Sequence, residues 1–437
     1  MCLLGWKQAW AESFSLNQEK YRFSGFATIG AARGGNNTLG FRRNNSQEGH
    51  FNSHWSLEPD TLLGLHLDAD FSQNLAGAVQ LVARDRTGND FKDMVGWAYL
   101  RYHLNPAFAV RAGRFGLDLF LLSEYRSLGL AYLWVRPPME FYGSISFDHV
   151  DGLDIAYQRQ LDDGYLEIKL FAGQTQNTLG HQRDEVDFIL APVYGLTVTW
   201  EDTHWRIKLG LSNDRFDKKM SREFGATQLI DALEQTTAGI QGTPIVWPEA
   251  PRLADDLDMK GTGINYYSLG AAYDANPWMV QAEVALIASD YAMYQDHYSS
   301  YLSFGYRVGP TTLYAMTALA ESRNDRKLIP EPTLALPDTI GSLPQSEQDA
   351  LIESSNSQLA VLSQLHGSLQ KYHDATIVDQ KTLSLGIRWD ILHNLVFKVQ
   401  LDRTEVKAYG SALWDPPETL TKNQTLNTYS LNLNYVF

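Results

Sequence analysis

The chain has 437 residues, of which 44% are hydrophobic and 20% are charged, and its formal net charge is −15. No segment approaches the roughly 18 consecutive apolar residues that a transmembrane helix requires, which excludes a helical membrane protein. The acidic balance argues against nucleic acid as a partner, because phosphate binding requires a basic surface.

Residues 1–19 resemble the remnant of a signal peptide followed by a lead-in segment. Ala9, Trp10 and Ala11 have the small-x-small form of a cleavage site, but the apolar run at residues 2–6 is short. We therefore expect a truncated or misassigned start codon. The single cysteine, Cys2, follows no lipobox and is not interpreted as a lipid anchor. Residues 20–437 contain no linker, and we predict that they form one domain.

Apolar and polar residues alternate along most of this domain. In residues 63–71 every odd position is apolar, and the pattern returns in residues 166–172, 205–211, 278–286 and 395–401. A period of two indicates a strand with one apolar and one polar face. Counting such segments from residues 21–32 to residues 426–437 predicts about sixteen strands.

The connections between these strands alternate between short and long. Short turns are predicted at residues 73–74, 105–107, 162–164, 201–204, 275–277, 308–310 and 391–394. Long loops are predicted at residues 33–60, 115–151, 175–188, 213–263, 321–380 and 404–423, and two outer connections, at residues 85–92 and 288–296, are shorter. This alternation is typical of outer-membrane barrels, which have short periplasmic turns and longer outer loops.

Large aromatic residues flank the short turns on the apolar face, as Trp200, Trp205, Tyr273, Trp278 and Trp389 do. A soluble β-protein gives no reason for amphipathic rings to gather at one end of its strands, whereas a bilayer interface does. We therefore predict an all-β protein, a transmembrane antiparallel β-barrel of about sixteen strands. A barrel of that size encloses water, whereas about eight strands would be filled by side chains.

The last strand, residues 429–437, has an apolar or aromatic residue at every second position and ends on Phe437. It resembles the C-terminal signal that the barrel-assembly machinery reads. Together with residues 97–102, 111–116 and 130–142, it gives the chain a resemblance to the Gram-negative outer-membrane porin superfamily.

This resemblance implies passive diffusion of small hydrophilic solutes or ions through a homotrimer in outer-membrane lipid and lipopolysaccharide, without a cofactor. It also implies that the loop after the fifth strand folds inward and constricts the channel. Here that loop is more aromatic and apolar than the acidic-tipped loop of general-diffusion porins.

The polar faces of the strands supply the candidate site residues. The expected pore-lining residues are Asp68, Asp70, Arg101, Arg111, Lys169, Arg206, Lys208, Glu283, Arg388 and Lys398, and the same faces carry Asp154, Glu167, Arg307 and Asp402. The expected constriction-loop residues are Glu124, Arg126, Trp134, Arg136 and Glu140. We expect Arg136 and Glu140 to lie near Arg101, Arg111, Arg388 and Lys398. Charged rings of this kind set ion selectivity, and the mixed wall predicts a mild anion preference.

Two outer loops contain helical patterns, at residues 224–235 and 350–371, which we expect to pack on the loops themselves or over the channel mouth. No predicted helix carries a His-x-x-x-His metal pair and no Gly-x-Ser-x-Gly turn occurs, so we expect neither an enzyme nor a metal site. The alternative to a channel is a barrel scaffold or surface-interaction protein that uses its long loops.

Overall fold

A computed structural model describes residues 14–15, 20–51, 54–87, 90–145, 147–181, 184–217, 226–336, 338–416 and 418–437. Cys2 and nearly all of the predicted signal-peptide remnant lie outside these residues. No helix in the described ranges is both long and apolar enough to cross a membrane.

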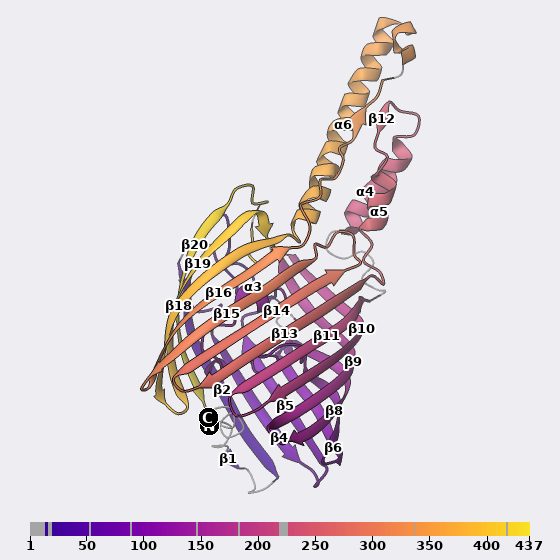
Figure 1. The fold of residues 1–437 in the computed structure, drawn as a ribbon. Coiled ribbons are helices and arrows are strands. Elements are labelled where there is room, and N and C mark those ends of the chain that lie inside the picture. Colours follow the sequence, from indigo (N-terminus) through magenta and orange to yellow (C-terminus); the bar gives the residue numbers. More distant parts are fainter. Residues whose placement is uncertain are drawn as a thin grey trace.

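Sixteen antiparallel strands form a closed barrel in the described part of the chain (Figure 1). They are β2 (Tyr21–Arg33), β4 (Leu62–Asp70), β5 (Leu75–Arg84), β6 (Val95–Asn105), β7 (Phe108–Gly116), β8 (His149–Leu161), β9 (Gly164–His181), β10 (Asp184–Glu201), β11 (Trp205–Phe216), β13 (Gly263–Ala275), β14 (Trp278–Ser289), β15 (His297–Val308), β16 (Thr311–Ser322), β18 (Val378–Leu392), β19 (Leu395–Ser411) and β20 (Gln424–Val436). The first of these strands, β2, pairs with the last, β20, and so closes the barrel.

Short additional strands lie beside the barrel. The two-residue strands β1 (Phe14–Ser15) and β3 (Trp55–Ser56) both pair with β2. Outside the barrel, β12 (Ile245–Val246) pairs with β17 (Thr333–Leu334).

All seven predicted short turns join neighbouring strands, which confirms the predicted order of strands. Two predicted loop boundaries are wrong. Residues 175–181 and 184–188 continue β9 and β10 as a paired hairpin, and residues 404–411 continue β19. The sequence lacks clear alternation where β9 and β10 meet, because a strand that extends beyond the membrane has water on both faces and no apolar side to mark it.

Helices occupy the outer loops. The helix α4 (Ala226–Gly239) and the helix α6 (Gln345–Asp374) lie where the sequence predicted helices, whereas α5 (Ala250–Asp256) was not predicted. These three helices project beyond one end of the barrel as a narrow tower (Figure 1). Shorter helical turns are α2 (Phe91–Met94), η1 (Gly129–Ala131), α3 (Met139–Tyr142) and η3 (Asp338–Ser342).

The outer surface of the barrel is apolar. Leu67 is 39% exposed and Val284 is 53% exposed, both on strands with buried polar residues on the opposite face. The predicted ring of aromatic residues is present near the short turns, where Trp278 and Trp389 are each 47% exposed and Trp205 lies 4.8 Å from Tyr273 between ring centroids. An exposed apolar band with an aromatic rim is the surface that a bilayer covers.

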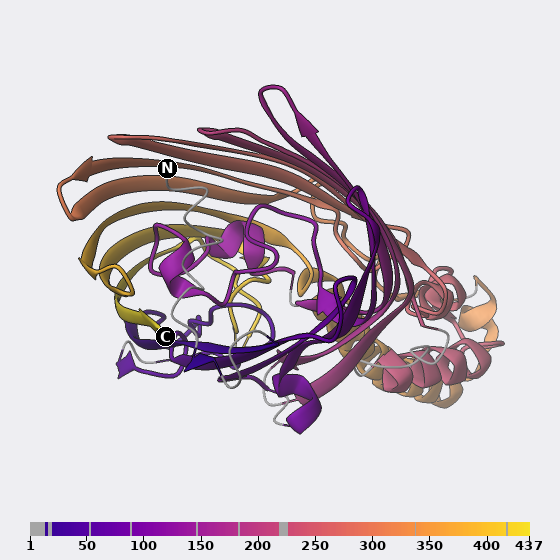
Figure 2. The same ribbon diagram turned by 90° about the horizontal axis from the view of Figure 1, so that it is seen from below.

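A hydrophobic core cluster fills part of the barrel around the loop between β7 and β8, residues 117–148, and continues into the helices α4, α5 and α6. Figure 2 shows this segment, with η1 and α3, within the barrel wall. Trp134 and Phe141 are each 1% exposed and pack against Tyr301 of β15, with ring centroids 5.3 Å and 5.5 Å away. We call residues 117–148 the inner loop.

Candidate functional site

The side chain of Lys398, on β19, binds the backbone of the inner loop. Its ammonium donates to the carbonyl oxygens of Gly129 at 2.6 Å, Tyr132 at 2.5 Å and Trp134 at 2.6 Å. Arg388 of the neighbouring strand β18 donates to the carbonyl oxygens of Leu130 and Tyr132, each at 2.9 Å. Both cations point inward as expected, but the inner loop covers them, and Lys398 is completely buried.

Glu283 of β14 is also covered rather than open to the lumen. Its carboxylate accepts hydrogen bonds from the backbone N–H of Leu121 at 2.8 Å, from the Tyr301 hydroxyl at 2.6 Å and from the Tyr142 hydroxyl. Since Glu283 is 1% exposed, this group fixes the start and the end of the inner loop to one wall.

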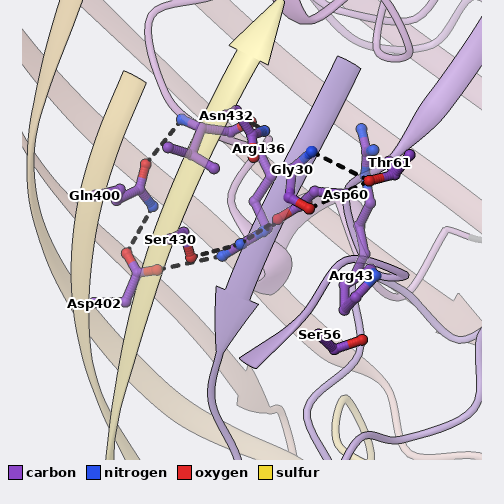
Figure 3. Close-up of polar contacts among 12 residues, drawn as sticks. Gly30, Arg43, Ser56, Asp60, Thr61, Arg136, Gln400, Asp402, Ser430 and Asn432 are labelled. Atoms are coloured by element: carbon purple, nitrogen blue, oxygen red, sulfur yellow. Dashed lines mark hydrogen bonds and ion pairs between the residues drawn. The ribbon is translucent and has the colours of Figure 1, made fainter. Parts of the chain in front are cut away.

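Arg136 fastens the middle of the inner loop at the barrel seam (Figure 3). Its guanidinium donates to both carboxylate oxygens of Asp60, at 3.0 Å and 2.5 Å, and to the Ser430 hydroxyl at 2.6 Å. Asp402 lies 3.5 Å away on its other side. Two parallel bonds to one carboxylate give a well-oriented ion pair.

Glu140 lies in α3 and is 2% exposed. Its carboxylate accepts hydrogen bonds from the Gln380 side-chain amide at 2.7 Å and from the Thr382 hydroxyl. Burial raises the pKa of Glu140, and these two donors only partly oppose the shift. The direct partners of Arg136 and Glu140 are therefore residues other than Arg101, Arg111, Arg388 and Lys398.

The other predicted loop residues have separate contacts. Trp134 donates from its indole N–H to the Ser303 hydroxyl at 2.7 Å. Arg126 donates to the carbonyl oxygens of Ile145 and Phe147 at 2.9 Å and 2.8 Å, within the inner loop itself. These contacts leave the opposite side of the barrel, from β4 to β11, with open interior space.

A cavity of about 360 Å³ occupies that space. Its lining includes five of the predicted cations, namely Arg101, Arg111, Lys169, Arg206 and Lys208, together with Glu124 of the inner loop. Four of these cations are paired: Arg111 with Asp154 at 2.7 Å, Arg206 with Glu201 at 3.3 Å, and Lys169 and Lys208 with Asp118.

Two smaller cavities adjoin the large one. A cavity of about 180 Å³ is lined by Asp68 and Asp70 and shares Arg101 with the large cavity. A narrow cavity of about 30 Å³ lies between Trp97 of β6 and the inner loop, and shares Glu124 and Tyr125 with the large cavity. The three spaces follow one wall of the barrel and not its axis.

Asp118, at the start of the inner loop, was missed by sequence reasoning. Burial would raise its pKa, but the ammonium groups of Lys169 and Lys208 hold the pKa well below its usual range. In the sequence, the position of Asp118 between apolar Leu117 and Leu119 could have indicated a buried carboxylate. Asp60, the partner of Arg136, carried no comparable signal in the sequence.

The barrel is similar to solved outer-membrane channels over nearly its whole length. Salmonella typhi OmpF, solved with daunomycin, matches with a TM-score of 0.52 and 10% identity, over 97% of this chain and 100% of that chain. The outer-membrane channel DcaP of Acinetobacter baumannii matches with a TM-score of 0.50 and 11% identity, over 96% and 99%. An anion-selective porin from Comamonas acidovorans matches with a TM-score of 0.50 and 11% identity, over 95% and 99%.

The fold is the porin fold. No protein-family model and no curated protein matches the sequence, so the likeness rests on the arrangement of the strands. The porin fold, together with the apolar band around the barrel, places the chain in the outer membrane of a Gram-negative bacterium, as predicted.

Within this porin fold, the predicted lumen residues divide into two groups. Asp68, Asp70, Arg101, Arg111, Lys169, Arg206 and Lys208 line the cavities. Glu283, Arg388 and Lys398 line none of these cavities, and their contacts are with the inner loop. Arg307, near the short-turn end of β15, pairs with Asp274 at 2.6 Å. No group of three His, Cys, Asp or Glu side chains in the described residues is arranged to hold a metal ion.

Proposed function

We propose that this protein is a porin that allows passive diffusion of small hydrophilic solutes or ions through its barrel, without a cofactor or a catalytic step. The observation that carries the proposal is the series of adjoining, charge-lined cavities beside the inner loop. Charged walls around a low-dielectric passage act on solutes more strongly than the same charges in bulk water.

We further propose that the inner loop forms the constriction. Its residues Glu124 and Arg126 border the narrow cavity, opposite Trp97 and Gln80. The other three predicted constriction residues, Trp134, Arg136 and Glu140, support this role indirectly, since they bind the loop to the barrel wall. The loop would then set the pore size by filling one side of the lumen.

We propose a mild anion preference from the arginines around Asp148, which lines the narrow cavity together with Glu124 and Arg126. Arg84 lies 3.0 Å and Arg86 lies 3.7 Å from the single carboxylate of Asp148, and Arg43 donates to the carbonyl oxygen of Arg126 at 3.1 Å. Four guanidinium groups therefore lie close to one another around one acid. An excess of fixed positive charge favours anions in the passage.

Single-channel recording in planar bilayers tests this proposal. We expect discrete conductance steps from the purified protein, and in a potassium chloride gradient a reversal potential displaced toward that of chloride. Arg84→Gln should reduce this displacement, whereas Arg252→Gln, in the tower helix α5, should not. Absence of conductance from correctly folded protein would refute the channel function.

We propose that the protein assembles as a homotrimer, contacts lipid and lipopolysaccharide, and is inserted by the barrel-assembly machinery through its last strand. Phe437 is positioned for such a signal, since its backbone pairs with Gly25 through bonds of 2.9 Å and 3.0 Å at the seam. Mass measurement of the detergent-extracted protein tests the trimer. Deletion of Phe437 should reduce the amount of barrel in the outer membrane.

A surface-interaction role is the second candidate, favoured by the tower. The helix α6 has 30 residues and projects beyond the barrel together with α4 and α5 (Figure 1). Removal of residues 338–358 separates the two candidates. Loss of a cellular phenotype with unchanged conductance would assign that phenotype to the tower.

A further inference from the structure

The strand β6 presents a continuous row of recognition groups to the cavities. Trp97 lines the narrow cavity, and Tyr99, Arg101 and His103 line the 180 Å³ cavity. The rings of Trp97 and Tyr99 have centroids 6.5 Å apart, and the Arg101 guanidinium lies 5.5 Å from the centroid of Tyr99. Alternate residues of one strand share a face, so this order follows directly from the sequence.

Arg101 differs from the other cavity cations. In the part of the chain that the structure describes, no carboxylate lies within ion-pair distance of its guanidinium, whose hydrogen bond goes to the Tyr99 hydroxyl at 3.0 Å. Arg101 also borders both larger cavities. Asp68 and Asp70 line the 180 Å³ cavity too, but they pair with His66 at 3.2 Å and with Arg22 at 2.7 Å. A guanidinium with free donors at a cavity wall is suited to a carboxylate, which it can bind through two parallel bonds.

The inner loop contributes a third aromatic ring to this row, and the charge of its nearby glutamate is neutralised by cations. Tyr125 borders the narrow cavity together with Trp97. Its neighbour Glu124 lies 3.2 Å from Arg111 and 3.7 Å from Lys169, so its negative charge is compensated. A carboxylate solute would thus meet aromatic faces first and an unpaired cation next.

We propose that this row is a binding site for small planar carboxylates, with the flat part of the solute against Trp97 and Tyr125 and its carboxylate on Arg101. The ring of Tyr99 lies between them under the guanidinium groups of Arg101 and Arg111, at 5.5 Å and 5.2 Å from its centroid. Aromatic faces favour flat partners, and the fork of an arginine favours a carboxylate over a neutral group. This inference rests on the proposed channel function and specifies its solute class.

Three probes distinguish the two halves of the site by their block of the single-channel current. Benzoate has both the flat ring and the charge, cyclohexanecarboxylate keeps the charge without the flat ring, and benzamide keeps the ring without the charge. We expect benzoate to reduce the current at concentrations about tenfold lower than either of the other two, which corresponds to about 1.4 kcal/mol.

Variants then assign each preference to its residue. Arg101→Gln should remove the preference for benzoate over benzamide, and Trp97→Leu should remove the preference for benzoate over cyclohexanecarboxylate. Arg307→Gln is the matched control, since it removes a charge that is already paired at the rim. Arg101→Lys tests geometry, because an ammonium keeps the charge and loses the fork.

Calorimetric titration of benzoate into the detergent-solubilised protein separates the site from the channel. Binding without conductance would retain the site and refute the channel. Conductance with equal responses to the three probes would refute the site and retain the channel. A Trp97-dependent block by maltose as strong as that by benzoate would show that the rings serve sugars, and would overturn the carboxylate assignment.

Discussion

At the scale of single residues, Lys398 is the side chain on which the inner loop depends most. Each hydrogen bond from a charged donor contributes about 1.5–3 kcal/mol, and Lys398 makes three to loop carbonyl oxygens. We expect Lys398→Met to release the loop, because these carbonyls would lose their donor while buried. The measurement is the rate at which protease cleaves residues 117–148 in the folded barrel.

Lys407→Met is the control for Lys398, since the Lys407 side chain is 60% exposed and reaches only acids near the outer ends of the strands. It should leave cleavage of the loop unchanged. Equal protection in both variants would show that the loop is held without Lys398.

Glu140 gives the docked loop a dependence on pH. Burial raises the pKa of Glu140 above its usual 4.5, so the folded protein holds this proton more tightly than the unfolded chain does. The contribution of Glu140 to stability is therefore present at low pH and declines as pH rises through the raised pKa. Glu140→Gln removes the titrating carboxyl group. The Tm of this variant should therefore fall less between pH 5 and pH 8 than the Tm of the wild type.

Glu331→Gln, at an exposed position next to β17, is the matched control and should follow the wild type in that comparison. The structure also implies that Glu140→Gln leaves ion selectivity unchanged, because Glu140 is buried against β18. A selectivity change from this variant would show that Glu140 faces the solute.

At the scale of elements, deletion of residues 128–139 tests the inner loop as the constriction. This change removes η1, Trp134 and Arg136, and it uncovers the side of the lumen in front of β14 to β20. We expect a clear rise in single-channel conductance, because the open cross-section increases. Deletion of residues 338–358 from the tower, the control, should leave conductance unchanged.

An unchanged conductance after the inner-loop deletion would transfer the role of the constriction to another segment, with residues 321–380 considered first. The two deletions would then give the opposite result, with the tower deletion raising the conductance.

Strands and helices were predictable from the sequence to different degrees. Within the membrane, lipid on one side and water on the other force a period of two, so β4, β11 and β14 were recognisable. The outer ends of β9 and β10 were not recognisable, because water surrounds both faces of a strand outside the membrane and no alternation is required there. The helix α5 has seven residues, too few to show a helical period.

At the scale of the whole molecule, the lipid-facing band predicts a strong asymmetry between the two faces of each strand. We expect Leu67→Arg to destabilise the barrel by about 2–4 kcal/mol, because a charge near the bilayer midplane loses its hydration. The measurement is urea-induced unfolding of the barrel in lipid vesicles.

Gln281→Arg is the control, since Gln281 faces inward and donates to the Tyr301 hydroxyl at 2.7 Å. It should unfold at nearly the wild-type urea concentration. Equal destabilisation by both substitutions would show that the faces of the strands are wrongly assigned.

Of the candidate site, the alternation of apolar and polar residues predicted only which side chains face the interior of the barrel. That alternation directs Arg101, Arg111 and Lys398 to the interior, but it does not say which of them the inner loop covers. Lys398 binds Gly129, 269 positions earlier in the chain, and no local pattern encodes such a contact. The open part of the lumen thus became visible only with the loop in place.

The pairing of β2 with β20 has a consequence for assembly. Ala27 pairs with Tyr435, so the contact that closes the barrel joins its first and last strands and forms only when both are present. Until then, both edge strands carry backbone donors and acceptors that lipid cannot satisfy. Insertion of an unclosed sheet into the bilayer is therefore unfavourable, and closure of the barrel and stable insertion depend on the same pair of strands.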